Sequence, residues 1–233
     1  SGVDRGLMLP MAGMDAYDHD TNSTATFQIN EVVFCLDRSG SMKFDMTGIT
    51  WSYAGGNPYV SWPYNFWSYY YARPHPTQSR WAILLNAIDV FMEESENTDF
   101  PPRMGLVTWS SGINAAGANT VEYAMPSKTI SWDANRSVIE ARLAAVGQGS
   151  NTAGVFGGTE MASGMEAGIA ALQTANSHAY ANRVMILLTD GEYSGPDPIT
   201  VVPAANDAGI TIHCVSLLAG STYNKAREIA QAT

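Results

Sequence analysis

The stretch Val32-Val33-Phe34-Cys35-Leu36-Asp37-Arg38-Ser39-Gly40-Ser41 decides the fold. Its first half is apolar and partly β-branched, which predicts a buried strand. A carboxylate and two hydroxyls follow at once, so we expect the strand to end in a polar loop. Asp37, Ser39 and Ser41 offer only oxygen ligands. That set suits a hard divalent cation such as Mg²⁺ and argues against zinc or copper.

Two further loops carry oxygen ligands later in the chain. Gly157-Gly158-Thr159-Glu160 lies in the middle, and Leu188-Thr189-Asp190-Gly191 follows a second apolar run. A single polar turn after a strand is more often only a loop. Three such loops in this order favour one shared site.

Together these residues resemble the von Willebrand factor type A (vWA) domain with its metal-ion-dependent adhesion site (MIDAS). The resemblance covers about residues 31–233. It implies that Ser39, Ser41 and Thr159 face the metal directly or nearly so, and that Asp37 and Asp190 act largely through bound water. The implied ion is Mg²⁺, with Mn²⁺ or Ca²⁺ as alternatives.

Neutral hydroxyls beside the metal leave most of its charge uncompensated, so an open position attracts a carboxylate. The expected function is therefore divalent-metal-dependent adhesion. The module would bind an Asp or Glu of a protein partner, on a bacterial surface or pilus. The alternative is a structural assembly subunit, whose metal site or aromatic loop holds neighbouring copies of itself. Size measurement with and without EDTA separates the two.

Strand and helix patterns alternate along the chain. This alternation predicts an α/β fold with a doubly wound, mainly parallel central sheet, one antiparallel edge strand and helices on both faces. Cys35 and Cys214 fall in strands that the expected order separates by a third, so no disulfide is expected. Beyond the first strand, the patterns predict strands over 103–110, 120–125, 183–189 and 209–218, and helices over 79–97, 136–146, 159–175, 198–208 and 222–232.

An insertion at residues 43–78 carries 11 of the 24 aromatic residues. Its prolines and paired glycines forbid a long helix and predict an irregular, partly self-packed loop. The rings form either a recognition platform beside the metal or a cover for the sheet edge. The candidate ligand-binding aromatics are Trp51, Tyr53, Trp62, Trp67 and Tyr70.

The chain has 233 residues, enough for one sizeable domain. Residues 1–30 read as an extended N-terminal lead, and residues 31–233 as the vWA domain. The family continues with a sixth strand and a final helix, so we expect a truncated C-terminal end.

A net charge of −10 disfavours nucleic acid or an anionic membrane as a partner. No run of 18 apolar residues predicts a membrane span, and the expected location is extracellular or at the cell surface.

No catalytic motif supports an enzyme. The sequence lacks Gly-x-Ser-x-Gly, a phosphate-binding Gly-x-x-x-x-Gly-Lys and His-Glu-x-x-His. Its four histidines adjoin no obvious nucleophile.

Within the vWA family, the amino-acid sequences of several segments look most like those of bacterial TadG-like proteins, which are associated with Tad/Flp pili. These segments are Ser79-Arg80-Trp81-Ala82, Met104 to Ser111, Gly158-Thr159 with Met165 to Gly168, and Gly209 to His213.

Overall fold

A five-stranded sheet forms the centre of the molecule, in a computed structural model that describes residues 29–47, 53, 55–62, 64–111, 119–149, 154–191, 193–218 and 223–233. The strand order is β3-β2-β1-β4-β5. The strands are β1 (Asn30–Asp37), β2 (Arg103–Trp109), β3 (Asn119–Tyr123), β4 (Asn182–Thr189) and β5 (Ile210–Ser216).

The sheet is parallel except at one edge. β1 pairs in parallel with β2 and with β4, β4 pairs in parallel with β5, and β3 runs antiparallel to β2. The predicted fold class is therefore confirmed. Asp37 lies opposite Trp109, and Leu36 lies opposite Leu188. The carboxyl ends of the two central strands thus reach the same edge, which we call the carboxyl edge.

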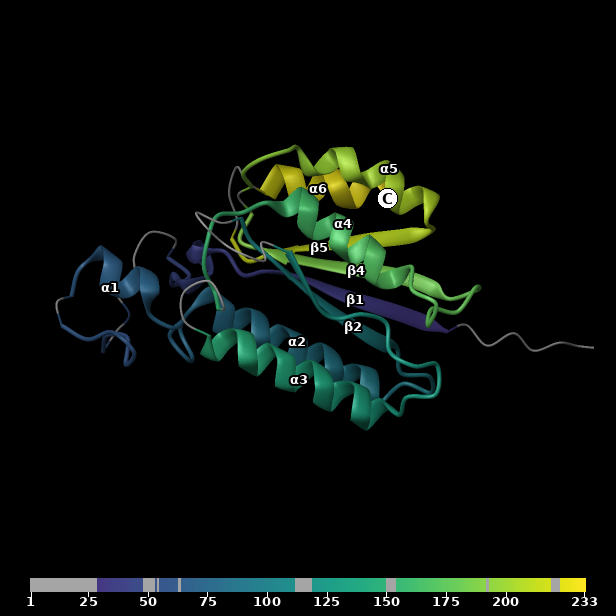
Figure 1. The fold of residues 1–233 in the computed structure, drawn as a ribbon, viewed down its shortest axis with the longest axis horizontal. Helices are drawn as coiled ribbons and strands as arrows, with labels where there is room; N and C mark the ends of the chain where they lie inside the picture. The colour runs from purple at the N-terminus through teal and green to yellow at the C-terminus, as the bar shows by residue number, and fades with distance from the viewer. Residues whose placement is uncertain are drawn as a thin grey trace, which may run out of the picture.

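Helices cover both faces of the sheet (Figure 1). α2 (Arg80–Glu96) and α3 (Trp132–Gln148) lie on one face; α4 (Met161–Leu172), α5 (Val202–Asp207) and α6 (Tyr223–Ala232) lie on the other. Ser79 and Ser131 cap α2 and α3 by accepting backbone N–H bonds from the first turns. Each face has its own buried apolar cluster, so the sheet is fixed from both sides.

Several boundaries differ from the sequence-based prediction. α3 begins at Trp132, four residues earlier than expected, because Ser131 supplies the cap. The helix expected over 198–208 is a 3₁₀ turn, η3 (Pro198–Val201), followed by the short α5. α4 ends at Leu172, before the expected residue 175. The strand expected over 183–189 was predicted to be fully buried, but Arg183, Val184 and Ile186 of β4 are only partly buried.

The two cysteines are unpaired, as predicted. Leu187 of β4 lies between them, opposite Cys35 of β1 on one side and Cys214 of β5 on the other. A whole strand therefore separates the two sulfurs.

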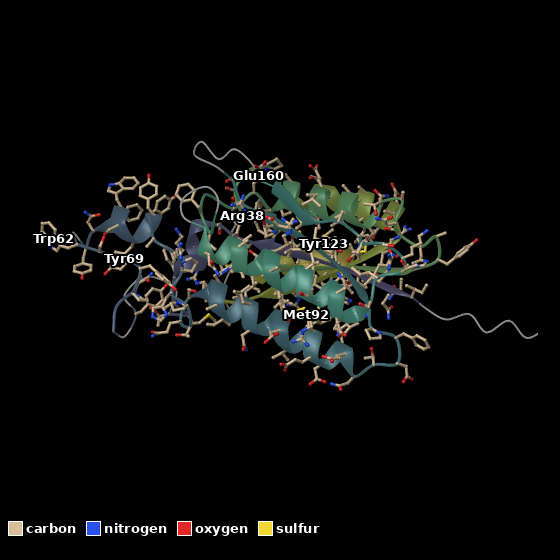
Figure 2. The ribbon with its side chains drawn as sticks, turned by 60° about the horizontal axis from the view of Figure 1, so that its bottom comes forward. Arg38, Trp62, Tyr69, Met92, Tyr123 and Glu160 are labelled. Carbon is tan, nitrogen blue, oxygen red and sulfur yellow. The ribbon has the colours of Figure 1, made fainter. Side chains whose placement is uncertain are left out.

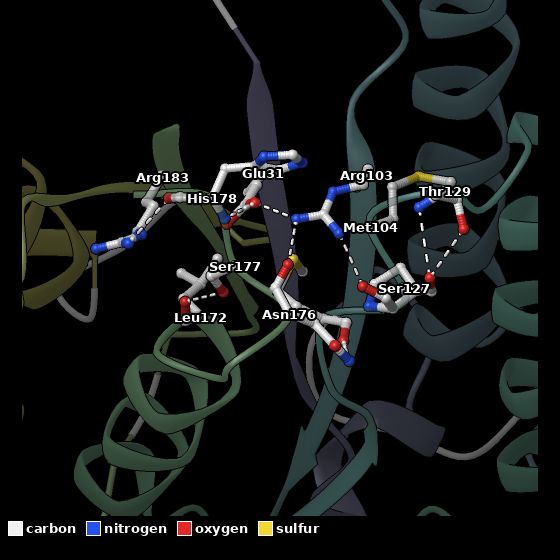
Figure 3. A network of polar contacts seen from close by, with 12 residues as sticks. Glu31, Arg103, Met104, Ser127, Thr129, Leu172, Asn176, Ser177, His178 and Arg183 are labelled. Carbon is white, nitrogen blue, oxygen red and sulfur yellow. Dashed lines mark hydrogen bonds and ion pairs between the residues drawn. The ribbon is translucent and has the colours of Figure 1, made fainter. Parts of the chain in front are cut away.

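A buried ion pair closes the opposite end of the sheet, which we call the amino edge (Figure 3). Glu31 of β1 is fully buried, and one carboxylate oxygen accepts bonds from the Arg103 guanidinium and from the backbone N–H of His178. Arg103 also donates to the carbonyl oxygens of Pro126, at 2.8 Å, and Asn176, at 2.9 Å. This network ties two strands to two loops.

Among the described residues, no helix is long and apolar enough to cross a membrane. The extended lead expected over residues 1–30 lies outside the described residues except for its last two.

Candidate metal centre

Asp37 ends β1 at the carboxyl edge, where both of its carboxylate oxygens are held. Oδ1 accepts the backbone N–H of Ser39 at 2.8 Å, and Oδ2 accepts the hydroxyl of Thr189 at 2.8 Å. Asp37 is fully buried. The chain then turns into η1 (Gly40–Lys43), which brings the hydroxyls of Ser39 and Ser41 to 2.9 Å from each other. The predicted Asp-x-Ser-x-Ser group is therefore one connected cluster.

Asp190, which directly follows β4, is the second buried carboxylate of this edge. Its Oδ2 accepts a bond from Nη1 of Arg80 at 2.5 Å. Its Oδ1 is buried and has no hydrogen-bond partner in the described parts of the chain. A buried carboxylate oxygen without a partner costs free energy, so this atom is suited to a ligand such as a metal-bound water or a cation.

The loop before α4 delivers Thr159 to the same edge. Gly157 accepts a bond from the backbone N–H of Gly40 at 2.8 Å. Gly157 has a φ of 96°, and a Cβ there would lie 2.3 Å from the carbonyl oxygen of Ser111, so only glycine allows this approach. Thr159 is held by a backbone bond to Ser194, whose N–H donates to its carbonyl oxygen at 2.6 Å. All three predicted loops therefore meet at the carboxyl edge.

The charge of Asp190 raises the free-energy cost of ionising Asp37. Burial, followed by the charge of Asp190, raises the pKa of Asp37 to about 7, although the bonds from Ser39 and Thr189 oppose this rise. A cation between the carboxylates would relieve this repulsion. Within the described ranges, no group of three or more His, Cys, Asp or Glu side chains could hold a metal ion. The edge thus offers two carboxylates with neutral hydroxyls, a donor set that fits a hard cation better than zinc.

The sequence profile of the von Willebrand factor type A domain matches residues 77–233, about two thirds of the chain. The chain belongs to the vWA domain family. The fold agrees, because a parallel sheet with one antiparallel edge strand and helices on both faces is what the resemblance implied. A search of curated proteins found no match.

Solved structures share this fold at low sequence identity. The pilus adhesin SpaC of Lactobacillus rhamnosus GG, in its open conformation, has a TM-score of 0.56 and 16% identity, over 91% of this chain and 27% of that one. The manganese-loaded TRAP protein of Plasmodium vivax has a TM-score of 0.55 and 12% identity, over 88% of this chain and 63% of that one. Mussel byssus thread matrix protein 1, with a zinc-occupied MIDAS motif, has a TM-score of 0.50 and 11% identity, over 88% and 47%.

These vWA structures therefore include metal-loaded forms and proteins named as an adhesin and a matrix protein. The present chain spans less than two thirds of the length of these three. At such low identity, the likeness establishes the fold.

The aromatic insertion projects beyond the carboxyl edge (Figure 1). It contains one short helix, α1 (Phe66–Tyr71), which Asn65 caps, although an irregular loop was expected. Trp62 is 81% exposed at its outer tip (Figure 2), and Trp67 is exposed as well. Tyr70, by contrast, is half-buried and packs on Phe156, with 4.8 Å between ring centroids.

Of the other candidate aromatics, Tyr53 is only 6% exposed and packs on His75, with 4.6 Å between ring centroids. This ring is buried within the insertion, and its role in ligand binding stays a prediction. Trp51 lies outside the described residues. Some rings of the insertion therefore pack together while others face solvent, and a role of the exposed rings in recognition stays a prediction.

Three residues of the edge were not foreseen from the sequence. Arg80 binds Asp190, and Lys43 donates its ammonium to the carbonyl oxygen of Tyr70 at 2.5 Å. Phe156 joins the loop of Thr159 to α1 through its contacts with Tyr70 and Tyr71. The position of Arg80 directly after a helix cap was the one available signal, since it places a charge at the edge where helices and loops meet.

Proposed function

We propose that this vWA domain is a divalent-metal-dependent protein-binding module. Asp37, Ser39, Ser41, Thr159 and Asp190 would hold Mg²⁺, and an Asp or Glu of a partner protein would complete the site. The observation that carries the proposal is the pair of buried carboxylates at adjacent strand ends, one with an unpartnered oxygen, beside the linked hydroxyls. When bound, the metal would supply a positive charge that attracts an anionic side chain.

The family and fold support adhesion rather than catalysis. The structural neighbours include a pilus adhesin, and we extend its setting to this chain as a proposal: a location on a bacterial surface or pilus. His75 has no catalytic arrangement, because its Nδ1 accepts the backbone N–H groups of Thr77 and Gln78. Since a binding module needs only a charged site and a surface around it that contacts the partner, we propose a non-enzymatic role.

Metal binding is tested by thermal unfolding of EDTA-stripped protein as Mg²⁺ or Mn²⁺ is added. A cation at 100 times its dissociation constant should stabilise the protein by about 2.7 kcal/mol, which raises Tm by several degrees. Asp190→Ala should abolish the shift, whereas Asp197→Ala, a surface acid of the same type, should keep it. An equal shift in wild type and Asp190→Ala would contradict the assigned site.

Ligand binding is tested with poly-L-glutamate as the acidic probe. We expect it to bind immobilised wild-type protein in Mg²⁺ and to be released by EDTA, whereas Asp37→Ala should not bind it. Binding that persists in EDTA would contradict a metal-bound carboxylate.

The exposed aromatic residues favour a second function, assembly with neighbouring copies. Trp62, Tyr64, Phe66 and Trp67 are all exposed on one projection, and a cluster of this kind often marks an interface. Sedimentation with and without EDTA separates the two functions. Metal-dependent oligomers favour assembly through the site, and a metal-indifferent monomer favours recognition of another protein.

A further inference from the structure

Arg80 stands out among the cations at the carboxyl edge because it is the one seen to bond a proposed metal-site carboxylate. It is 3% exposed, and its Nη1 lies 2.5 Å from Oδ2 of Asp190. Two flanking cations are committed to the backbone, since Arg38 donates to the carbonyl oxygen of Gly154 and Lys43 to that of Tyr70.

The guanidinium of Arg80 does not depend on Asp190 for its position. Its Nε donates to the carbonyl oxygen of Asp45 at 3.1 Å, and the ring of Phe44 lies 5.2 Å from its central carbon. Its backbone N–H also donates to the carbonyl oxygen of Phe44, at 2.8 Å. These contacts hold the positive charge independently of Asp190, so the charge stays whether or not Asp190 changes partner.

We propose that Arg80 is a built-in counter-cation that competes with the metal for Asp190 and thereby sets the metal affinity of the site. Asp37, Asp190 and Arg80 together carry a charge of −1 when both carboxylates are ionised. Without Arg80 they would carry −2. Because cation sites gain affinity with the charge of their ligands, the arginine weakens metal binding.

The charge of Arg80 also strengthens the step that follows metal binding, in which the site binds an acidic side chain of the partner. This inference rests on the proposed function and deepens it. A divalent ion in a site of charge −1 leaves a net positive charge, which an incoming carboxylate neutralises. In a site of charge −2 the ion leaves no net charge, and the attraction is smaller. Arg80 therefore shifts electrostatic attraction from the metal to the acidic partner.

The charge of Arg80 also replaces the cation in metal-free protein. With Arg80 present, one of the two buried carboxylates is paired, so the fold does not require metal. Without it, Asp37 and Asp190 would face each other unpaired, and folding would depend on a cation.

The test is calorimetric titration of Mn²⁺ into EDTA-stripped wild type, Arg80→Gln and Arg80→Lys. Arg136→Gln serves as the control, because Arg136 pairs with Asp89, Glu96 and Glu140 on the surface. We expect Arg80→Gln to bind about tenfold more tightly or better, and the other two variants to resemble wild type. Thermal unfolding in EDTA and in Mn²⁺ should show a larger metal-induced shift for Arg80→Gln than for wild type.

The outcomes separate this inference from the proposed function. If the wild type binds Mn²⁺ and Arg80→Gln binds it equally or more weakly, the counter-cation inference is overturned and the metal site stands. If only Arg80→Gln binds Mn²⁺, the counter-cation inference is supported and metal dependence of the wild type is overturned. If neither protein binds Mn²⁺, both the inference and the proposed metal site are overturned. If Arg80→Gln folds only when Mn²⁺ is present, the inference is supported; if it is unfolded in millimolar Mn²⁺, Arg80 is a structural residue and the inference fails.

Discussion

The two edges of the sheet each bury an arginine against a carboxylate, but in different proportions. At the amino edge, Glu31 meets Arg103, and backbone groups from two loops complete the network. At the carboxyl edge, Arg80 pairs with Asp190, whereas Asp37 is held by the backbone N–H of Ser39 and the hydroxyl of Thr189. The pair Glu31 and Arg103 is electrically neutral, whereas the group of Asp37, Asp190 and Arg80 carries a charge of −1 when both carboxylates are ionised.

This difference shows that a buried ion pair does not identify a functional site by itself. The pair at the amino edge joins strands to loops, and the second carboxylate oxygen of Glu31 is buried without a partner in the described structure, as one oxygen of Asp190 is. What the carboxyl edge adds is a second buried carboxylate, Asp37, in the same loop as the linked hydroxyls of Ser39 and Ser41. The imbalance of charge, rather than burial, is what a cation could correct.

The largest effect is expected at the amino edge. Arg103→Met should leave Glu31 as a buried, uncompensated carboxylate and destabilise the protein by about 3–5 kcal/mol. Because this pair lies at the far end of the sheet, the loss should be the same in EDTA and in Mg²⁺. Urea unfolding under both conditions measures it, and a loss that Mg²⁺ reverses would break the distinction between the edges.

The carboxyl edge should respond to pH in metal-free protein. Burial and the charge of Asp190 raise the pKa of Asp37 to about 7 from an ordinary 3.8. The folded state therefore binds a proton more tightly than the unfolded state does. The contribution of Asp37 to stability should be full below about pH 4 and decline as pH rises towards 7, by an amount on the order of 4 kcal/mol.

Asp37→Asn provides the comparison for this pH dependence. It removes the titrating group, so urea unfolding in EDTA should show a smaller decline between pH 4 and 7 than in wild type. Equal declines in both proteins would mean that Asp37 is not the group responsible.

A smaller effect on stability is expected where the aromatic insertion contacts η1, the turn that carries Ser41 of the proposed metal site. Lys43→Met removes the bond to the Tyr70 carbonyl oxygen and should cost about 1–2 kcal/mol. It should also speed chymotrypsin cleavage within the insertion. Lys128→Met, at an exposed position, is the matched control. Unchanged cleavage would show that the insertion is held by its ring contacts alone.

The smallest effect on stability is expected at the tip of the insertion. Trp62→Ala should change the free energy of unfolding by less than about 0.5 kcal/mol, because the side chain is exposed. If the exposed rings form part of the recognition surface, the same variant should weaken binding of poly-L-glutamate or self-association, measured by sedimentation. Unchanged binding and association would limit the functional surface to the metal centre.

Much of the fold and of the candidate site could be predicted from local patterns. The apolar run ending at Asp37 indicated a central strand, and the alternation of strands and helices indicated a parallel sheet. Parallel strands place their carboxyl ends together, which is why the sequence alone predicts that Asp37 and Asp190 lie at one edge. The likeness to TadG-like proteins stays a prediction.

What could not be predicted depends on contacts between distant residues. The place of Arg80 directly after a helix cap puts its charge near the carboxyl edge but does not show that the side chain turns inward, because an arginine in the first turn of a helix is usually solvated. Tyr53 and Trp62 have similar local surroundings, yet one is packed on His75 and the other is exposed. Capping by Asn65 produced a short helix where an irregular loop was predicted, although the prolines excluded only a long helix.

The attachment of the aromatic insertion to two loops has a mechanical consequence. Lys43 belongs to the first polar loop, and Phe156 precedes Thr159 in the second; both contact the end of α1. A tensile load applied to the insertion would therefore divide between two attachment points, one on each of two loops that carry proposed metal ligands, in addition to the chain itself. A partner that pulled on these rings would strain both loops, so the same few contacts would affect partner binding and any metal binding.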